Sequence, residues 1–124
     1  MKKIALLSDN TKRVFKAVTE REAPFALVIY WPWFYKSWIG LTIGFIVFTK
    51  NSDDVAHLCH ELVHVEHFYK APFLFWMRYF KERKRVGYWN NRYEKEAYAV
   101  QYKVQSLLQR EAYQRQVLGQ KISN

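Results

Sequence analysis

The sequence predicts an α+β fold, in which a small sheet packs against three or four helices. Two observations carry this prediction. The N-terminal part of the chain contains short runs rich in β-branched and aromatic residues, whereas the remainder repeats its apolar residues at helical spacing. With 124 residues, 50% of them hydrophobic, the chain has the size of a single domain spanning residues 1–124.

The N-terminal part is expected to contain a helix and two strands. The triplet SDN at residues 8–10 can cap a helix that runs to about Glu22. The run FALVIY at residues 25–30 then reads as a strand, and LTIGFIVFT at residues 41–49 as a second strand that could pair with it. The intervening segment WPWFYKSW at residues 31–38 is expected to be a loop.

The rest of the chain is expected to be helical. Asn51, Ser52 and Asp53 can cap a helix that ends near Lys70, and Asp54 adds a negative charge that is favourable at its start. A second, aromatic helix is predicted over residues 73–84. From Arg92 onward the apolar residues follow one helical stripe, which predicts a long C-terminal helix that frays before Gly119.

Composition bears on the cellular location of the protein and on its possible partners. Cys59 is the only cysteine, so no intramolecular disulfide can form and a cytoplasmic location is expected. No uncharged run reaches the roughly 20 residues of a spanning helix, so no transmembrane segment is expected. The formal charge of +9 could attract nucleic acid or an anionic surface, and exposed aromatic residues could serve a partner or a homodimer.

The helix predicted after residue 54 carries all four histidines, within HLCHELVHVEHF at residues 57–68. At about 100° per residue, the four imidazoles point into an arc of about 80°. His60 and His64 are four residues apart, the spacing at which two imidazoles on one helix face can bind a single Zn²⁺. Glu61 lies at the edge of that face, where it could hold a zinc-bound water and take its proton.

An inert, histidine-rich helix is the alternative interpretation. In a chain with four histidines, H-E-x-x-H is expected by chance on the order of one time in a hundred. The context favours a metal site, because the motif lies on a capped helix behind a strong strand. Leu62, Val63 and Val65 would supply uncharged surroundings that bury it.

A catalytic zinc site needs a third protein ligand and leaves one position open for water or substrate. His57, His67 and Asp53 are candidates, but His57 and His67 share the helix with the histidine pair, so a ligand from another element is geometrically easier. The segment NNRYEKEAY at residues 90–98 offers two glutamates at the start of the last helix. Glu94 and Glu96 flank its apolar stripe at about 80° on either side, so periodicity leaves both candidates open.

The two motifs together resemble the gluzincin class of zinc metallopeptidases, with HELVHVEH followed about thirty residues later by YEKEA. The likeness is greatest to the minigluzincins and to the catalytic core of the CAAX-prenyl-protease and heat-shock-protease family, and it covers roughly residues 41 to 100. It implies that His60, His64 and Glu94 hold one Zn²⁺, with Glu96 as the alternative third ligand.

The resemblance implies a zinc metalloendopeptidase, a hydrolase that cleaves a peptide bond with a metal-activated water. Glu61 would act as the catalytic proton shuttle. A protein or peptide substrate would bind as an extended strand along residues 41–49. Tyr88, Arg92 and His67 are candidate donors of a hydrogen bond to the oxyanion.

One position departs from the class. Many of its members have an aspartate directly after the alanine of the second motif, where it supports a ligand histidine, whereas this chain has Tyr98 after Ala97. The groups that would orient the ligand histidines are therefore not identified by the sequence.

Two other functions remain open from the sequence. One is a non-catalytic, zinc-stabilised interaction protein, which would bind zinc without turnover. The other is a basic nucleic-acid-binding module, for which KERKR at residues 81–85 supplies positive charge. Binding by such a module would survive Glu61→Gln, whereas peptide hydrolysis would not.

Overall fold

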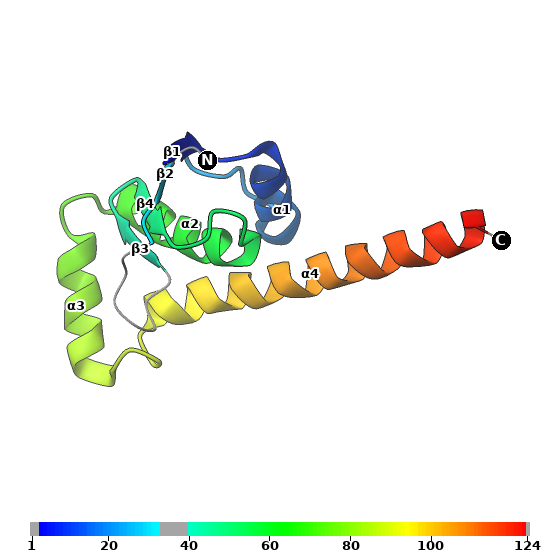
Figure 1. The fold of residues 1–124 in the computed structure, drawn as a ribbon. Helices are drawn as coiled ribbons and strands as arrows, with labels where there is room; N and C mark the ends of the chain where they lie inside the picture. The colour runs from blue at the N-terminus through cyan, green and yellow to red at the C-terminus, as the bar shows by residue number, and fades with distance from the viewer. Residues whose placement is uncertain (1–2, 33–39, 124) are drawn as a thin grey trace.

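The computed structural model describes residues 3–32 and 40–123. In chain order the elements are β1 (Ile4–Leu6), α1 (Asp9–Thr19), β2 (Leu27–Tyr30), β3 (Gly40–Ile43), β4 (Ile46–Thr49), α2 (Val55–Lys70), α3 (Phe75–Val86) and α4 (Arg92–Ser123). Four strands form one mixed sheet, and a long C-terminal helix extends beyond the rest of the molecule (Figure 1). The predicted α+β class is confirmed.

The sheet has the strand order β1-β2-β4-β3, with β2 parallel to β4 and the other two pairs antiparallel. The predicted pairing of the FALVIY strand with the following apolar run is confirmed, since Leu27 pairs with Ile46. The prediction of one strand over residues 41–49 was wrong. Gly44 has a φ of +62°, which a glycine adopts without a Cβ clash, so the run turns back on itself as the β3–β4 hairpin.

The predicted loop at residues 31–38 falls largely outside the described residues, which resume at Gly40. The hairpin that follows leaves β3 at one edge of the sheet and next to α2. Strand β1 was not predicted from the sequence; it pairs with β2 and forms the other edge of the sheet. The site described below is built beside the β3 edge.

The helix ends are set by local chemistry. The Ser8 hydroxyl accepts from the Thr11 amide at 3.1 Å, and α1 ends early at Glu20, whose φ of 61° is left-handed. The Asp54 carboxylate caps α2 by accepting from the His57 amide at 3.0 Å. The Ser8 cap agrees with the predicted start of α1, whereas α2 is capped by Asp54, one residue beyond the predicted cap residues 51–53.

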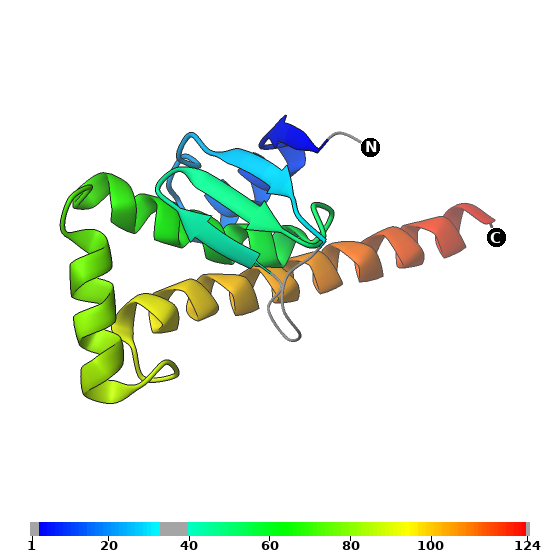
Figure 2. The ribbon, with the colours of Figure 1, turned by 60° about the vertical axis from the view of Figure 1, so that its left-hand side comes forward.

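The last helix is longer than expected, because α4 continues through Gly119 to Ser123. A glycine inside a helix costs only about 1 kcal/mol relative to alanine, so the flanking helix formers can carry the helix past it. The Arg13 guanidinium on α1 pairs with the Glu111 carboxylate at 2.9 Å. Beyond that contact α4 projects away from the sheet and from α2 (Figures 1 and 2).

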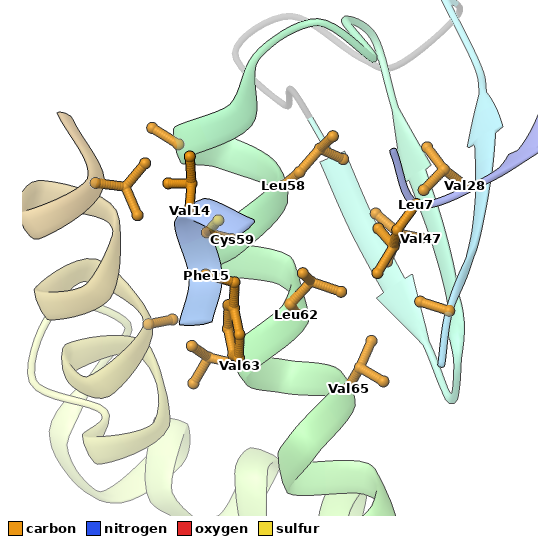
Figure 3. Close-up of a cluster of buried hydrophobic side chains, with 14 residues drawn as sticks. Leu7, Val14, Phe15, Val28, Val47, Leu58, Cys59, Leu62, Val63 and Val65 are labelled. Atoms are coloured by element: carbon orange, nitrogen blue, oxygen red, sulfur yellow. The ribbon is translucent and has the colours of Figure 1, made fainter. Parts of the chain in front are cut away.

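The hydrophobic core lies between the sheet and the helices on one side of it (Figure 2). Figure 3 shows Val14 and Phe15 of α1 facing Cys59 and Val63 of α2, with Val47 on the sheet side of that helix. Every residue of α2 from 56 to 65 is buried. Polar side chains on a buried helix need hydrogen-bond or metal partners. The four buried histidines of α2 therefore need such partners.

None of the helices in the described part of the chain is sufficiently long and apolar to cross a membrane.

Candidate metal centre

Two helices bring three polar side chains together in the interior. His60 and His64 lie one turn apart on α2, and Glu94 lies in the first turn of α4, against which α2 packs. The Oε1 atom of Glu94 is 3.1 Å from His60 Nε2 and 2.8 Å from His64 Nε2. One ligand atom from each residue lies within 4.8 Å of the others, and all three residues are buried. This group could hold a metal ion.

The start of α4 is fixed by a buried asparagine. Asn91 is fully buried, and its side-chain oxygen accepts from the Tyr93 amide at 2.9 Å, as a helix cap does. Its side-chain amide donates to the backbone oxygen of Tyr79 on α3 at 3.3 Å. The cap therefore ties the first turn of α4, which carries Glu94, to the neighbouring helix.

Tyr79 also holds the Glu94 side chain. Its hydroxyl donates to Glu94 Oε2 at 2.7 Å, while Oε1 faces the two histidines. A partner of this kind orients a ligand carboxylate and leaves one oxygen for the metal. This role of Tyr79 was not predicted from the sequence, because an aromatic residue at helical spacing is equally typical of core packing.

The donor set fits a metal ion. Two imidazole nitrogens and a carboxylate oxygen are ordinary zinc ligands, and here they converge from two elements. In the described structure the Nε2 atoms of His60 and His64 have no partner other than Glu94, whereas their Nδ1 atoms have none. A buried carboxylate oxygen shared by two imidazoles is an arrangement that a cation would stabilise.

The charges of the metal-free cluster follow from the same contacts. Burial opposes ionisation of Glu94, but hydrogen bonds to His60, His64 and then Tyr79 outweigh burial and hold the pKa of this carboxyl well below its usual range. Burial also opposes protonation of His64, but the hydrogen bond to Glu94 and the charge of Glu61 raise its pKa overall. The pair is therefore a carboxylate next to an imidazole that holds its proton more strongly than usual.

Metal binding should accordingly release a proton and weaken in acid. His64 must be neutral to bind a metal. Because its pKa is raised, protons begin to compete with the metal at a pH above the ordinary histidine pKa of about 6.5. Below that pKa the apparent affinity should fall by up to about tenfold per pH unit. Calorimetric titration in buffers of different ionisation enthalpy would count the released protons, and an affinity that does not change with pH would contradict the assignment.

Glu61 lies beside the cluster but outside the converging group. Its Oε2 accepts a hydrogen bond from the hydroxyl of Thr42 on β3, and its Oε1 is 4.0 Å from His57 Nε2. Glu61, Thr42 and His57 are all buried. The sequence placed Glu61 at the edge of the histidine face, but it gave no sign that Thr42 would fix it, because that contact depends on how β3 docks on α2.

Replacing Thr42 with valine should destabilise the fold by about 1.5–3 kcal/mol, since a buried carboxylate would lose its hydroxyl donor. The side chain keeps its shape, so packing changes little. Urea unfolding of the metal-free protein measures the effect. Thr42→Ser keeps the hydroxyl and is the matched control, and equal stability of the two variants would show that this hydrogen bond contributes nothing.

The cluster opens into a cavity of about 550 Å³ between β3, α2, α3 and the start of α4. Thr42, His57, Glu61 and the three converging residues form one part of its wall. Aromatic side chains form much of the remainder, namely Trp76, Tyr79, Phe80, Tyr88, Trp89 and Tyr98. Another hollow of about 420 Å³ lies along α4 beside Tyr113, but residues of a single helix cannot enclose a ligand.

Gly40 makes room for one of these wall residues. A Cβ atom added at Gly40 would lie 2.1 Å from His57 Nε2, so the imidazole occupies the space next to the first residue of β3. His57 Nε2 is buried and has no hydrogen-bond partner in the described structure. Burial lowers the pKa of His57, so the ring is neutral near pH 7, and the side chain forms part of the cavity wall with Nε2 against Gly40.

The other predicted site residues are dispersed. Tyr88 lines the cavity, and its hydroxyl shares a hydrogen bond of 3.0 Å with the Tyr98 hydroxyl. Burial and then this hydrogen bond raise the pKa of Tyr88, so the phenol stays protonated. Arg92 instead donates to the Tyr93 hydroxyl at 2.8 Å. His67 Nε2 lies 2.7 Å from Oε2 of Glu96, which is exposed. None of Arg92, His67 and Glu96 is among the residues that line the cavity.

Comparisons with protein-family models, curated proteins and solved structures give no match. The fold and the site themselves therefore define the class: an α+β domain with a buried His, His and Glu group that could hold a metal ion.

Proposed function

We propose that the chain is a zinc-dependent peptidase of the gluzincin type. His60, His64 and Glu94 hold the ion, and Glu61 is the catalytic acid–base. The observation that carries the proposal is the convergence of two imidazoles and one carboxylate oxygen from two helices, with a second carboxylate beside them in the same cavity. In this arrangement one set of residues can bind the metal and a different carboxylate can transfer the proton, as hydrolysis by a metal-activated water requires.

Zinc suits this donor set better than magnesium or calcium, which prefer oxygen ligands. Three protein ligands leave a fourth position for water or substrate. A zinc ion bound there supplies a Lewis acid that polarises a carbonyl and makes a water molecule nucleophilic near neutral pH.

The chain's own residues supply the proton transfer. The Glu61 carboxylate takes a proton from the attacking water and delivers it to the leaving amine. Thr42 holds Glu61 Oε2, which leaves Oε1 to accept that proton. The protonated Tyr88 phenol lines the cavity and donates to the oxyanion that develops on the substrate carbonyl.

The substrate is a polypeptide bound in extended form. β3 is an edge strand, and Gly40, Leu41 and Thr42 line the cavity. A peptide laid along this edge adds a strand by main-chain hydrogen bonds and places one of its carbonyls near the cluster. The lone cysteine, Cys59, is fully buried, and a reducing, cytoplasmic setting remains part of the proposal.

The proposal is tested by elemental analysis of the purified protein, followed by hydrolysis of a mixture of unstructured peptides. We expect one equivalent of zinc and turnover that a chelator abolishes and added zinc restores. Protein that takes up no metal from a zinc-replete solution would refute the metal centre. Zinc-loaded protein without turnover would leave the non-catalytic, zinc-stabilised alternative.

A further inference from the structure

Helix α3 and the turn before it expose an apolar ridge. Phe73, Met77 and Phe80 have exposed fractions of 93%, 70% and 54%. Phe73 lies in the turn before α3, in which the Phe75 amide donates to the Ala71 oxygen at 2.8 Å, and helical spacing places Met77 and Phe80 about 60° apart on α3. The opposite side of α3 packs into the molecule through Phe75 and Tyr79.

The ridge is bordered by positive charge. Five exposed basic residues lie on the same helix: Arg78, Lys81, Arg83, Lys84 and Arg85. The single acidic residue of α3, Glu82, is engaged by Arg85 at 2.7 Å. At about 100° per residue Lys84 lies within the ridge, Lys81 and Arg78 lie about 40° and about 100° beyond one edge of it, and Arg83 lies about 60° beyond the other.

We propose that α3 docks the protein on an anionic lipid surface. A helix with a basic border around an exposed apolar strip lies in the plane of a membrane interface, with its apolar side chains among the acyl chains and its cations at the lipid phosphates. The formal charge of +9 favours such a surface and opposes close approach of a second copy of the chain. Nucleic acid would match the charge but leave the ridge in water.

The docked helix is also a wall of the cavity. Trp76, Phe80 and Arg83 all line the cavity from α3. Trp89, at the same cavity, is 70% exposed, and an indole is well suited to the boundary between lipid and water. Docking through the ridge would therefore bring the cavity beside the membrane, where polypeptide segments close to the lipid surface could reach it.

The test is flotation of the full chain with vesicles of phosphatidylcholine alone or of equal parts phosphatidylcholine and phosphatidylglycerol. We expect binding to the anionic vesicles only, and less binding as salt is added. The triple variant Arg78→Gln, Lys81→Gln, Lys84→Gln should partition roughly a hundredfold more weakly, because each basic residue near such a surface contributes about fivefold.

A matched control removes three exposed charges from α4, by Lys103→Gln, Arg110→Gln and Arg115→Gln. This control should keep nearly full binding, and equal losses in the two variants would overturn the proposal, because net charge alone would explain them. The apolar ridge has its own pair of variants. Phe73→Ser with Met77→Ser should lose most binding, whereas Tyr102→Ser with Tyr113→Ser, which alters exposed α4 residues, should not.

Three further results would overturn the proposal. They are failure to float with anionic vesicles, equal binding to neutral ones, and tight binding to DNA that depends on the α3 cations but not on the ridge. None of these measurements depends on metal or peptidase activity.

Discussion

Replacing Glu94 with glutamine should remove the bound metal while the fold persists. The amide keeps the size of the carboxylate and an oxygen that can accept from Tyr79, but it lacks the negative charge that faces His60 and His64. Loss of groups that merely orient a ligand costs about 10–100-fold in metal affinity, so loss of the charged ligand itself should cost more than about 100-fold. Elemental analysis after dialysis would show less than one equivalent.

Glu96→Gln is the matched control. Glu96 lies two residues further along α4, is exposed, and has its carboxylate against His67 rather than against the cluster. The control should keep one equivalent of metal. If Glu96→Gln lost the metal and Glu94→Gln kept it, the metal site would be at His67 and Glu96. If both variants kept the metal, Glu94 would be excluded as a ligand.

Thermal unfolding distinguishes loss of metal from loss of fold. A ligand at about 1,000 times its dissociation constant stabilises the native state by about 4 kcal/mol. A chelator should therefore lower the melting temperature of the wild type and of Glu96→Gln, but not that of Glu94→Gln. A Glu94→Gln protein that does not melt cooperatively has lost its fold, and Glu94→Asp, which keeps the charge but is one methylene shorter, would then test whether the carboxylate must reach both histidines.

The part of the site predicted from the sequence is the part that lies on one helix. His60 and His64 face the same way because four residues are about one turn, and this holds wherever the helix packs. The choice between Glu94 and Glu96 depended on how α4 docks on α2, which helical periodicity does not determine. The structure places Glu94 against the pair and Glu96 against His67.

The supporting residues were hidden for the same reason. In the sequence, Tyr79 and Thr42 are typical helix and strand residues. Their contacts with Glu94 and Glu61 depend on how α3 and β3 pack around α2. The hairpin was missed because an unbroken apolar run masks a two-residue turn, for which Gly44 was the one available sign. By contrast, the pairing of β2 with the second apolar run could be predicted, because both segments are rich in β-branched and aromatic residues.

Replacing Glu61 with glutamine should leave the metal in place and remove hydrolysis. Glu61 is not one of the three converging residues, and its amide analogue can still accept from Thr42. An amide cannot take the proton of water, and a positioned acid–base group contributes about 10²–10⁴-fold to the rate. We therefore expect kcat to fall by that factor with KM nearly unchanged, because binding of the substrate is not altered.

Glu66→Gln on the same helix is the control for Glu61→Gln. Glu66 pairs with Arg21 at 2.8 Å and does not line the cavity, so its loss should leave both metal content and kcat unchanged. Hydrolysis that survives Glu61→Gln would assign proton transfer to another group, and His57, whose side chain lines the same cavity, would be the next to replace. Metal lost from Glu61→Gln would instead make Glu61 a ligand, and the separation of metal binding from proton transfer would fail.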